Sequence, residues 1–178
     1  MGKRKLLFIF LFPYLIHSQV GEKQFAFGSL TIKDGLSQNC VISMAQDSIG
    51  YLWFATQDGL NRYDGKNFTV FNKQFEDITR PTFSKLGKLY IDKENQLWII
   101  SNPSILEKYN SKSNSFQKIT SIEQVSSIFQ DQDLNHYIGT YNDGLYRIDA
   151  ISKDTTQVFK GKDQVTTVCK SSAKSGLI

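Results

Sequence analysis

The feature that most constrains the fold is an internal repeat of about 40 residues. In each copy an Asp precedes an aromatic residue by six positions, and a Tyr or Ile beside Asp or Asn follows. The aromatic residues are Trp53, Trp98 and Tyr137, which lie 45 and then 39 residues apart. The copies are DSIGYLWFATQDGLNRYD at 47–64, DKENQLWIISNPSILEKYN at 92–110 and DQDLNHYIGTYNDGLYRID at 131–149. A repeat of this length forms either a helical pair or a four-stranded sheet.

The residues within each copy favour strands. The segments are short, rich in β-branched and aromatic residues, and separated by turn signals such as Asp58-Gly59, Asp64-Gly65 and Asp143-Gly144. No apolar stripe at helical spacing persists for ten residues beyond the first twenty or so. We therefore expect four strands in each copy. The expected strands are 40–46, 52–56, 60–63 and 68–71 in the first copy, and 125–130, 136–140, 145–148 and 156–159 in the third.

The second strand of a copy is apolar on both faces, at 52–55 and again at 97–100. A sheet with one face in water should alternate instead, so each sheet is expected between two neighbours, as in a β-propeller. The large aromatic residue is then a wedge between sheets. The predicted fold is all-β: a propeller with four-stranded antiparallel blades near 40–72, 84–119 and 125–160, and a fourth blade starting at 164. About three and a half blades make an incomplete ring, because propellers have 4–8 blades.

The N-terminus has the layout of a secretory signal peptide. The basic stretch MGKRK precedes an apolar run from Leu6 to Ile16, which is too short to span a bilayer. We expect a signal peptide at 1–18 and a partial propeller at 19–178; a buried N-terminal strand is the alternative. Within the propeller, 27–32 is expected to be an outer strand that completes the last blade of a ring. Three basic residues of the signal supply +3 of the formal +4 charge, which leaves +1, so the pI near 9.0 does not indicate binding of nucleic acid.

Few residues suggest chemistry. The chain has two cysteines, Cys40 and Cys169, which we expect as free, partly buried thiols, and no zinc-type spacing of Cys and His. His136 takes the place of Leu52 and Leu97 in the repeat and reads as a strand residue. No phosphate-binding glycine loop or nucleophile elbow is present, so the sequence predicts no catalytic residue, no metal and no cofactor.

The first copy closely resembles the two-component regulator propeller repeat. It has that family's GLS-x-N motif at 35–39, Q-D at 46–47, a Leu-Trp pair at 52–53 and G-L-x-R-Y-D-G at 59–65. Ala55 replaces the usual Gly. The resemblance extends over roughly 27–178, although the second copy lacks both glycine turns and the third has Tyr137 in place of Trp.

The resemblance implies the periplasmic sensor of a hybrid two-component system, on the outer side of the inner membrane of a Gram-negative cell. In that family two propellers precede a small β-sandwich, a membrane span and a histidine kinase core. The ligands are typically oligosaccharides. The implied partners are therefore an oligosaccharide, the remaining blades and kinase region of a longer chain, and a second copy in a homodimer. The kinase core is absent from these 178 residues, so this chain is not expected to be an enzyme.

A ligand is expected at the loops that join second to third strands and at those that join blades, because function concentrates in loops on a rigid scaffold. Amides together with an aromatic face suit a sugar; for any single candidate residue the alternative is a solvated turn residue, which is the commoner role at such positions. Alternative functions are a secreted propeller lectin or polysaccharide lyase, and a non-functional truncated fragment. The candidate residues are Gln57, Asp58, Arg80, Asn102, Tyr141 and Asn142.

Overall fold

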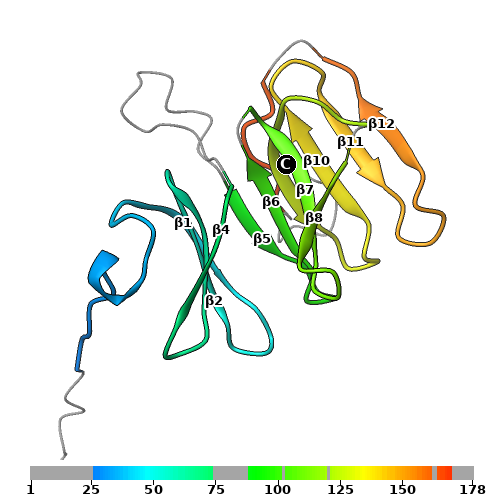
Figure 1. Cartoon of the computed structure of the whole chain (residues 1–178). Helices are drawn as coiled ribbons and strands as arrows, with labels where there is room; N and C mark the ends of the chain where they lie inside the picture. The colour runs from blue at the N-terminus through cyan, green and yellow to red at the C-terminus, as the bar shows by residue number, and fades with distance from the viewer. Residues whose placement is uncertain (1–25, 74–87, 102, 120, 162–163, 170–178) are drawn as a thin grey trace, which may run out of the picture.

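The computed structural model describes residues 26–73, 88–101, 103–119, 121–161 and 164–169, which form three four-stranded antiparallel sheets. Figure 1 shows the sheets in chain order, with the second between the other two. The first sheet contains β1 (Val41–Gln46), β2 (Leu52–Thr56), β3 (Gly59–Tyr63) and β4 (Phe68–Phe71). The second contains β5 (Lys88–Ile91), β6 (Leu97–Ser101), β7 (Ile105–Asn110) and β8 (Ser115–Lys118). The third contains β9 (Val125–Gln130), β10 (His136–Thr140), β11 (Leu145–Ile148) and β12 (Thr155–Phe159).

The all-β fold and the antiparallel four-stranded blades are confirmed, and the expected strands agree with the structure to within one residue at each end. The outer strand expected at 27–32 would complete the last blade of a closed ring, which is not among the described sheets, so it stays a prediction. Residues 26–31 form no strand, and η1 (Ile32–Asp34) is a 3₁₀ turn capped by Thr31. The signal peptide expected at 1–18 lies outside the described residues.

Each sheet has two rims. The turns from first to second strand and from third to fourth strand lie at one end of the sheet, which we call the turn rim. The turns from second to third strand lie at the other end, together with the connections between sheets, and we call this end the loop rim. This assignment follows from the antiparallel strand order in all three sheets.

The aromatic wedge between sheets is confirmed. Trp53 is 2% exposed and packs in one cluster with Leu97 and Ile99 of the second sheet. Trp98 lies in the next cluster, with Ile138 of the third sheet. Burial of both faces explains why the second strands lack apolar–polar alternation, since the two faces of β6 pack against different neighbouring sheets.

Gly144 provides a test of the turn chemistry. Its φ is +74°, and an added Cβ would lie 2.1 Å from the Phe159 carbonyl oxygen. We expect Gly144→Ala to lower the free energy of unfolding by about 1–3 kcal/mol, measured by urea denaturation. Gly65→Ala is the matched control, because φ is +95° there but nothing lies within 4 Å of the new Cβ. Equal losses for the two variants would show that contact with Phe159 contributes nothing.

Candidate functional site

The Asp that precedes each aromatic residue organises the turn between first and second strands. Asp47 accepts the backbone N–H groups of Gly50 and Tyr51 on Oδ1, at 3.0 and 2.9 Å, and the indole N–H of Trp53 on Oδ2, at 3.0 Å. We call this arrangement the clasp. It uses the carboxylate to hold the turn and the aromatic residue together, so the six-residue spacing serves the scaffold rather than catalysis.

The clasp recurs in the other sheets. Asp92 accepts the indole N–H of Trp98 at 2.8 Å, and its other oxygen accepts the N–H of Gln96 at 2.8 Å. In the third sheet Asp131 accepts the N–H of Asn135 at 2.9 Å. Burial is the main cause that raises the pKa of Tyr137, and the interaction with the Asp131 carboxylate raises it further.

A basic side chain lies over the clasped tryptophan. Arg62 is paired with Trp53 across the strands, and its Cζ lies 5.7 Å from the ring centroid. Lys108 has the same relation to Trp98, with Nζ at 5.3 Å. These distances allow cation–π attraction. The Arg of the G-L-x-R motif is therefore a scaffold element.

The GLS motif fastens the N-terminal segment to the first sheet. Gly35 has φ +107° and caps η1, and Leu36 is buried. The Ser37 hydroxyl lies 2.7 Å from that of Thr56, and the Ser37 N–H donates to Asn61 at 2.9 Å. Asn61 is fully buried, and its amide also donates to Ser37 at 2.8 Å. The motif therefore satisfies buried polar groups.

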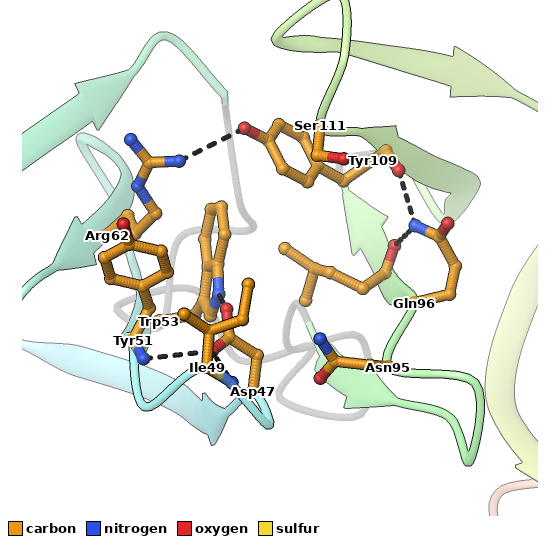
Figure 2. A pocket seen from close by; sticks show the side chains of 10 residues that line it. Asp47, Ile49, Tyr51, Trp53, Arg62, Asn95, Gln96, Tyr109 and Ser111 are labelled. Carbon is orange, nitrogen blue, oxygen red and sulfur yellow. Dashed lines mark hydrogen bonds between the residues drawn. The ribbon is translucent and has the colours of Figure 1, made fainter.

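A hollow on the turn rim lies between the first and second sheets (Figure 2). Its volume is about 120 Å³, and its lining includes Tyr51, Arg62, Asn95 and Tyr109. Arg62 donates to the Tyr109 hydroxyl at 3.3 Å across the hollow. Sites for small molecules usually have about 300–1,000 Å³. This hollow is therefore too small for an oligosaccharide.

A larger hollow, of about 320 Å³, lies on the loop rim of the third sheet. Among the residues that line it are Glu123, Gln124, Asn142, Asp143 and Tyr146. Hydroxyl, amide and carboxylate groups face the space around one aromatic side chain, a set that can exchange hydrogen bonds with the hydroxyls of a sugar. This hollow is the candidate ligand site.

Hydrogen bonds fix the polar groups of this site. The Asn142 amide donates to the Gln124 side chain, and the Tyr146 hydroxyl donates to Asp143. The bond from Tyr146 lowers the pKa of the Asp143 carboxyl, and the same bond raises the pKa of Tyr146. Asp143 is consequently an ionised acceptor at neutral pH. Gln124 has φ +52°, an uncommon conformation for a residue other than Gly or Asn.

The structure separates the residues that the sequence proposed for a ligand. Asn142 lines the candidate site, whereas Tyr141 is only 5% exposed, which leaves little of its ring for a sugar. Gln57 and Asp58 lie on the loop rim of the first sheet, where Gln57 accepts from Gln38 at 3.2 Å. Arg80 and Asn102 lie outside the described residues. The sequence did not indicate Glu123, Gln124, Asp143 or Tyr146; the one available signal was the Asp143-Gly144 turn, because Asp143 itself lines the hollow.

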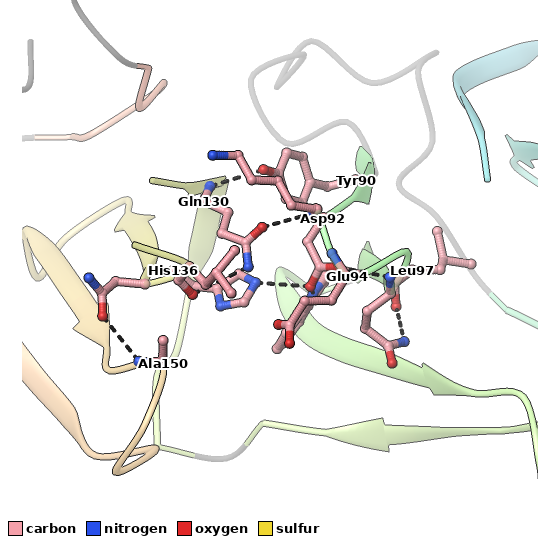
Figure 3. Close-up of polar contacts among 12 residues, drawn as sticks. Tyr90, Asp92, Glu94, Leu97, Gln130, His136 and Ala150 are labelled. Atoms are coloured by element: carbon pink, nitrogen blue, oxygen red, sulfur yellow. Dashed lines mark hydrogen bonds and ion pairs between the residues drawn. The ribbon is translucent and has the colours of Figure 1, made fainter. Parts of the chain in front are cut away.

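His136 has a role between sheets that the repeat did not indicate (Figure 3). Its Nε2 lies 3.0 Å from Asp92 Oδ2, and its ring centroid lies 4.8 Å from that of Trp98. Burial alone would raise the pKa of Asp92, but hydrogen bonds from His136, Trp98 and the Gln96 N–H lower it below its ordinary value. Both His136 and Asp92 are buried, so this contact joins the second and third sheets.

Other expectations concern metals, thiols and membranes. Among the described residues, no three His, Cys, Asp or Glu side chains gather in a way that could hold a metal ion. Both cysteines are free; Cys40 is partly buried, but Cys169 is exposed, contrary to expectation. Within the described part of the chain, no helix has the length and apolar character needed to cross a membrane.

Comparison with known proteins confirms the resemblance seen in the first repeat. The two component regulator propeller family matches residues 35–58. Histidine kinase P4 of Formosa agariphila is 44% identical over 72 residues, which are 40% of this chain and 5% of that kinase. The matched residues 35–58 contain the GLS motif, the first clasp and the Leu-Trp pair.

Solved structures share the fold. The extracellular domain of a protein described as a hybrid two component system, BT3049 from B. thetaiotaomicron, superposes with a TM-score of 0.62 at 25% identity, over 80% of this chain and 22% of that one. The extracellular domain of BT4673, described as a one component system, gives a TM-score of 0.60 at 19% identity, over 80% of this chain and 19% of that one. The chain spans about a fifth of the length of these structures and far less of the kinase.

Proposed function

We propose that this chain is the N-terminal part of an extracytoplasmic sensor propeller that binds an oligosaccharide and signals to a histidine kinase. The observation that carries the proposal is the similarity, in fold and at 25% identity, to the extracellular domain of a hybrid two component system. The match of the first repeat to the regulator propeller family supports it. The remaining blades, the kinase region and a homodimeric partner belong to the same proposal.

The ligand part of the proposal rests on the loop-rim hollow. Its polar groups suit a ligand rich in hydroxyls: Asp143 accepts, while Asn142 and Gln124 offer both donors and acceptors. Tyr146 supplies an aromatic surface. Its hydroxyl is already bonded to Asp143, so the ring is held in place before a ligand arrives.

Asn142→Ala tests the ligand site. Because it removes one hydrogen-bonding group from the hollow, we expect a loss in affinity of about 3–10-fold for a bound oligosaccharide. A panel of soluble oligosaccharides would be screened by isothermal titration calorimetry, and the variant compared on the best binder. Lys112→Ala, on the exposed β7–β8 turn at the opposite rim, is the matched control and should bind as the unaltered chain does.

Two outcomes would contradict the proposal. If no oligosaccharide binds, or if Asn142→Ala and Lys112→Ala bind equally, the loop rim of the third sheet is not the sugar site. If the coding sequence beyond Ile178 encodes no membrane span and no kinase, the signalling part fails even where sugar binds. Release of unsaturated products from a polysaccharide would instead favour the lyase alternative.

A further inference from the structure

The contacts between neighbouring sheets follow a rule at the turn rim. The residue after a clasp Asp donates its backbone N–H to a side-chain carboxamide of the next sheet. Ser48, which follows Asp47, donates to Asn95 Oδ1 at 2.5 Å. Lys93, which follows Asp92, donates to Gln130 Oε1 at 2.8 Å. We call this hydrogen bond the latch.

The latch leaves one acceptor and one donor without partners. Gln46 holds the place in the first sheet that Gln130 holds in the third, since each is paired with the first residue of the following strand. Gln130 is 2% exposed, whereas Gln46 is exposed, and no hydrogen bond of its side chain occurs within the described ranges. At the other end of the array, Gln132 follows the clasp residue Asp131, and its N–H has no partner among the described residues.

The face of the first sheet around Gln46 is also uncovered. Met44 is 73% exposed and Val70 is 49% exposed. The counterpart of Met44 in the third sheet, Ile128, packs against the second sheet. The N-terminal segment covers part of this face, where Ser37 meets Asn61 and Gly35 lies beside Phe68, but it leaves Met44 and Gln46 exposed. The first sheet therefore presents the face with which the third sheet docks, but without its neighbour.

We infer that this uncovered face is the docking surface for a further sheet of the same repeat, supplied by the same polypeptide, and that Gln46 recognises it. The carboxamide oxygen of Gln46 accepts the N–H of the residue that follows the clasp Asp of the incoming sheet. Met44 and Val70 then pack against the apolar side chains of the incoming sheet. Gln46 is thus a positioning residue that sets the register of the closing interface.

Two observations favour a sheet of the same polypeptide over a second copy. The N–H of Val165 donates to the Thr140 carbonyl at 3.0 Å, and the Ser126 hydroxyl donates to the Val165 carbonyl. This segment already lies against the third sheet, where a second copy of the first sheet would have to dock. This chain covers only 22% of the BT3049 structure, so the unmatched part of that structure is long enough for further sheets.

The inference rests on the proposed function only in taking the chain as part of a longer protein.

Photo-cross-linking tests the inference. The chain extended by the coding sequence after Ile178 would be purified with Cys40→Ser and Cys169→Ser, and Gln46→Cys would carry a benzophenone maleimide. Irradiation should cross-link the labelled residue 46 to a peptide beyond Ile178, and that peptide should have an Asp six residues before a Trp or Tyr. Lys112→Cys, on the exposed β7–β8 turn, is the control and should not reach that peptide.

Several outcomes would overturn the inference: cross-links confined to residues 26–169, cross-links to a ¹⁵N-labelled second copy, no cross-link above the control, or a stop codon after Ile178.

Hydrogen exchange provides a second measurement. Gln46→Ala should speed exchange of the N–H after the closing clasp Asp about tenfold, and Gln46→Glu, which keeps an acceptor oxygen, should restore it. Unchanged exchange in Gln46→Ala would refute the latch at this interface. Oligosaccharide binding is read separately, so failure of the latch and failure of the sensor proposal are distinguishable.

Discussion

Trp53→Ala lowers the free energy of unfolding by about 3–5 kcal/mol, the range for removal of a large buried aromatic side chain. The indole is 2% exposed, and its ring lies 5.1 Å from that of Tyr109 and 5.7 Å from that of Phe71. Truncation leaves a cavity in the apolar cluster that joins the first and second sheets. It also removes the donor that Asp47 accepts at 3.0 Å.

Urea denaturation followed by circular dichroism measures this loss. Trp53→Phe is the matched variant, because it retains an aromatic ring but lacks the indole N–H, and it should lose clearly less. Phe54→Ala, on the uncovered face of the same strand, should also lose less, because Phe54 is only partly buried. A loss below 1 kcal/mol for Trp53→Ala would mean that the first and second sheets do not unfold as one unit.

Asp92→Ala has the second large expected effect, a loss of about 3 kcal/mol or more in the free energy of unfolding. The side chain is buried and accepts hydrogen bonds from Trp98 at 2.8 Å and His136 at 3.0 Å. Alanine leaves both donors buried without this acceptor. The exposed carboxylate Asp64, which also organises a turn, provides the control: Asp64→Ala should lose about 1 kcal/mol or less.

The Asp92 interaction also predicts a pH dependence. Because the folded pKa of Asp92 is lower than its ordinary value of 3.8, its contribution to stability is fully present above about pH 4 and is lost as the pH falls through the folded pKa. Asp92→Asn cannot titrate. Its unfolding free energy, measured between pH 2 and pH 6, should therefore fall less steeply toward acid than that of the unaltered chain. Parallel curves would show that Asp92 does not contribute to the acid sensitivity.

Local patterns predicted most of the fold because they act over few residues. The Leu-Trp pair flanked by turns predicted the position and length of β2, and the apolar residues on both of its faces predicted burial between sheets. The position of Trp53 as a wedge followed from this reasoning and is confirmed. The six-residue spacing from Asp to the aromatic residue was visible in the sequence, but its cause, a carboxylate that accepts both the turn and the indole, required coordinates.

Contacts between sheets could not be predicted in the same way. His136 and Asp92 are 44 residues apart, and their contact depends on how two sheets pack. The ion pair between Lys73 and Glu107, at 2.7 Å, also joins segments distant in sequence. For the candidate site, the loop rim and Asn142 stay predictions, whereas the burial of Tyr141 could not be predicted from its place in a turn. Whether a turn residue points into a hollow depends on the neighbouring connection, here Glu123 and Gln124.

The latch makes each junction between sheets asymmetric: the sheet earlier in the sequence supplies the donor and the later sheet supplies the acceptor. At both described junctions the earlier sheet gives a backbone donor and the later sheet accepts it with a carboxamide, as Ser48 and Asn95 do, and as Lys93 and Gln130 do. Since the donor is a main-chain group, any residue except proline can occupy that position. Substitution of the residue after the clasp Asp therefore leaves the donor in place, whereas loss of the carboxamide of Asn95 or Gln130 removes the acceptor and weakens that junction alone.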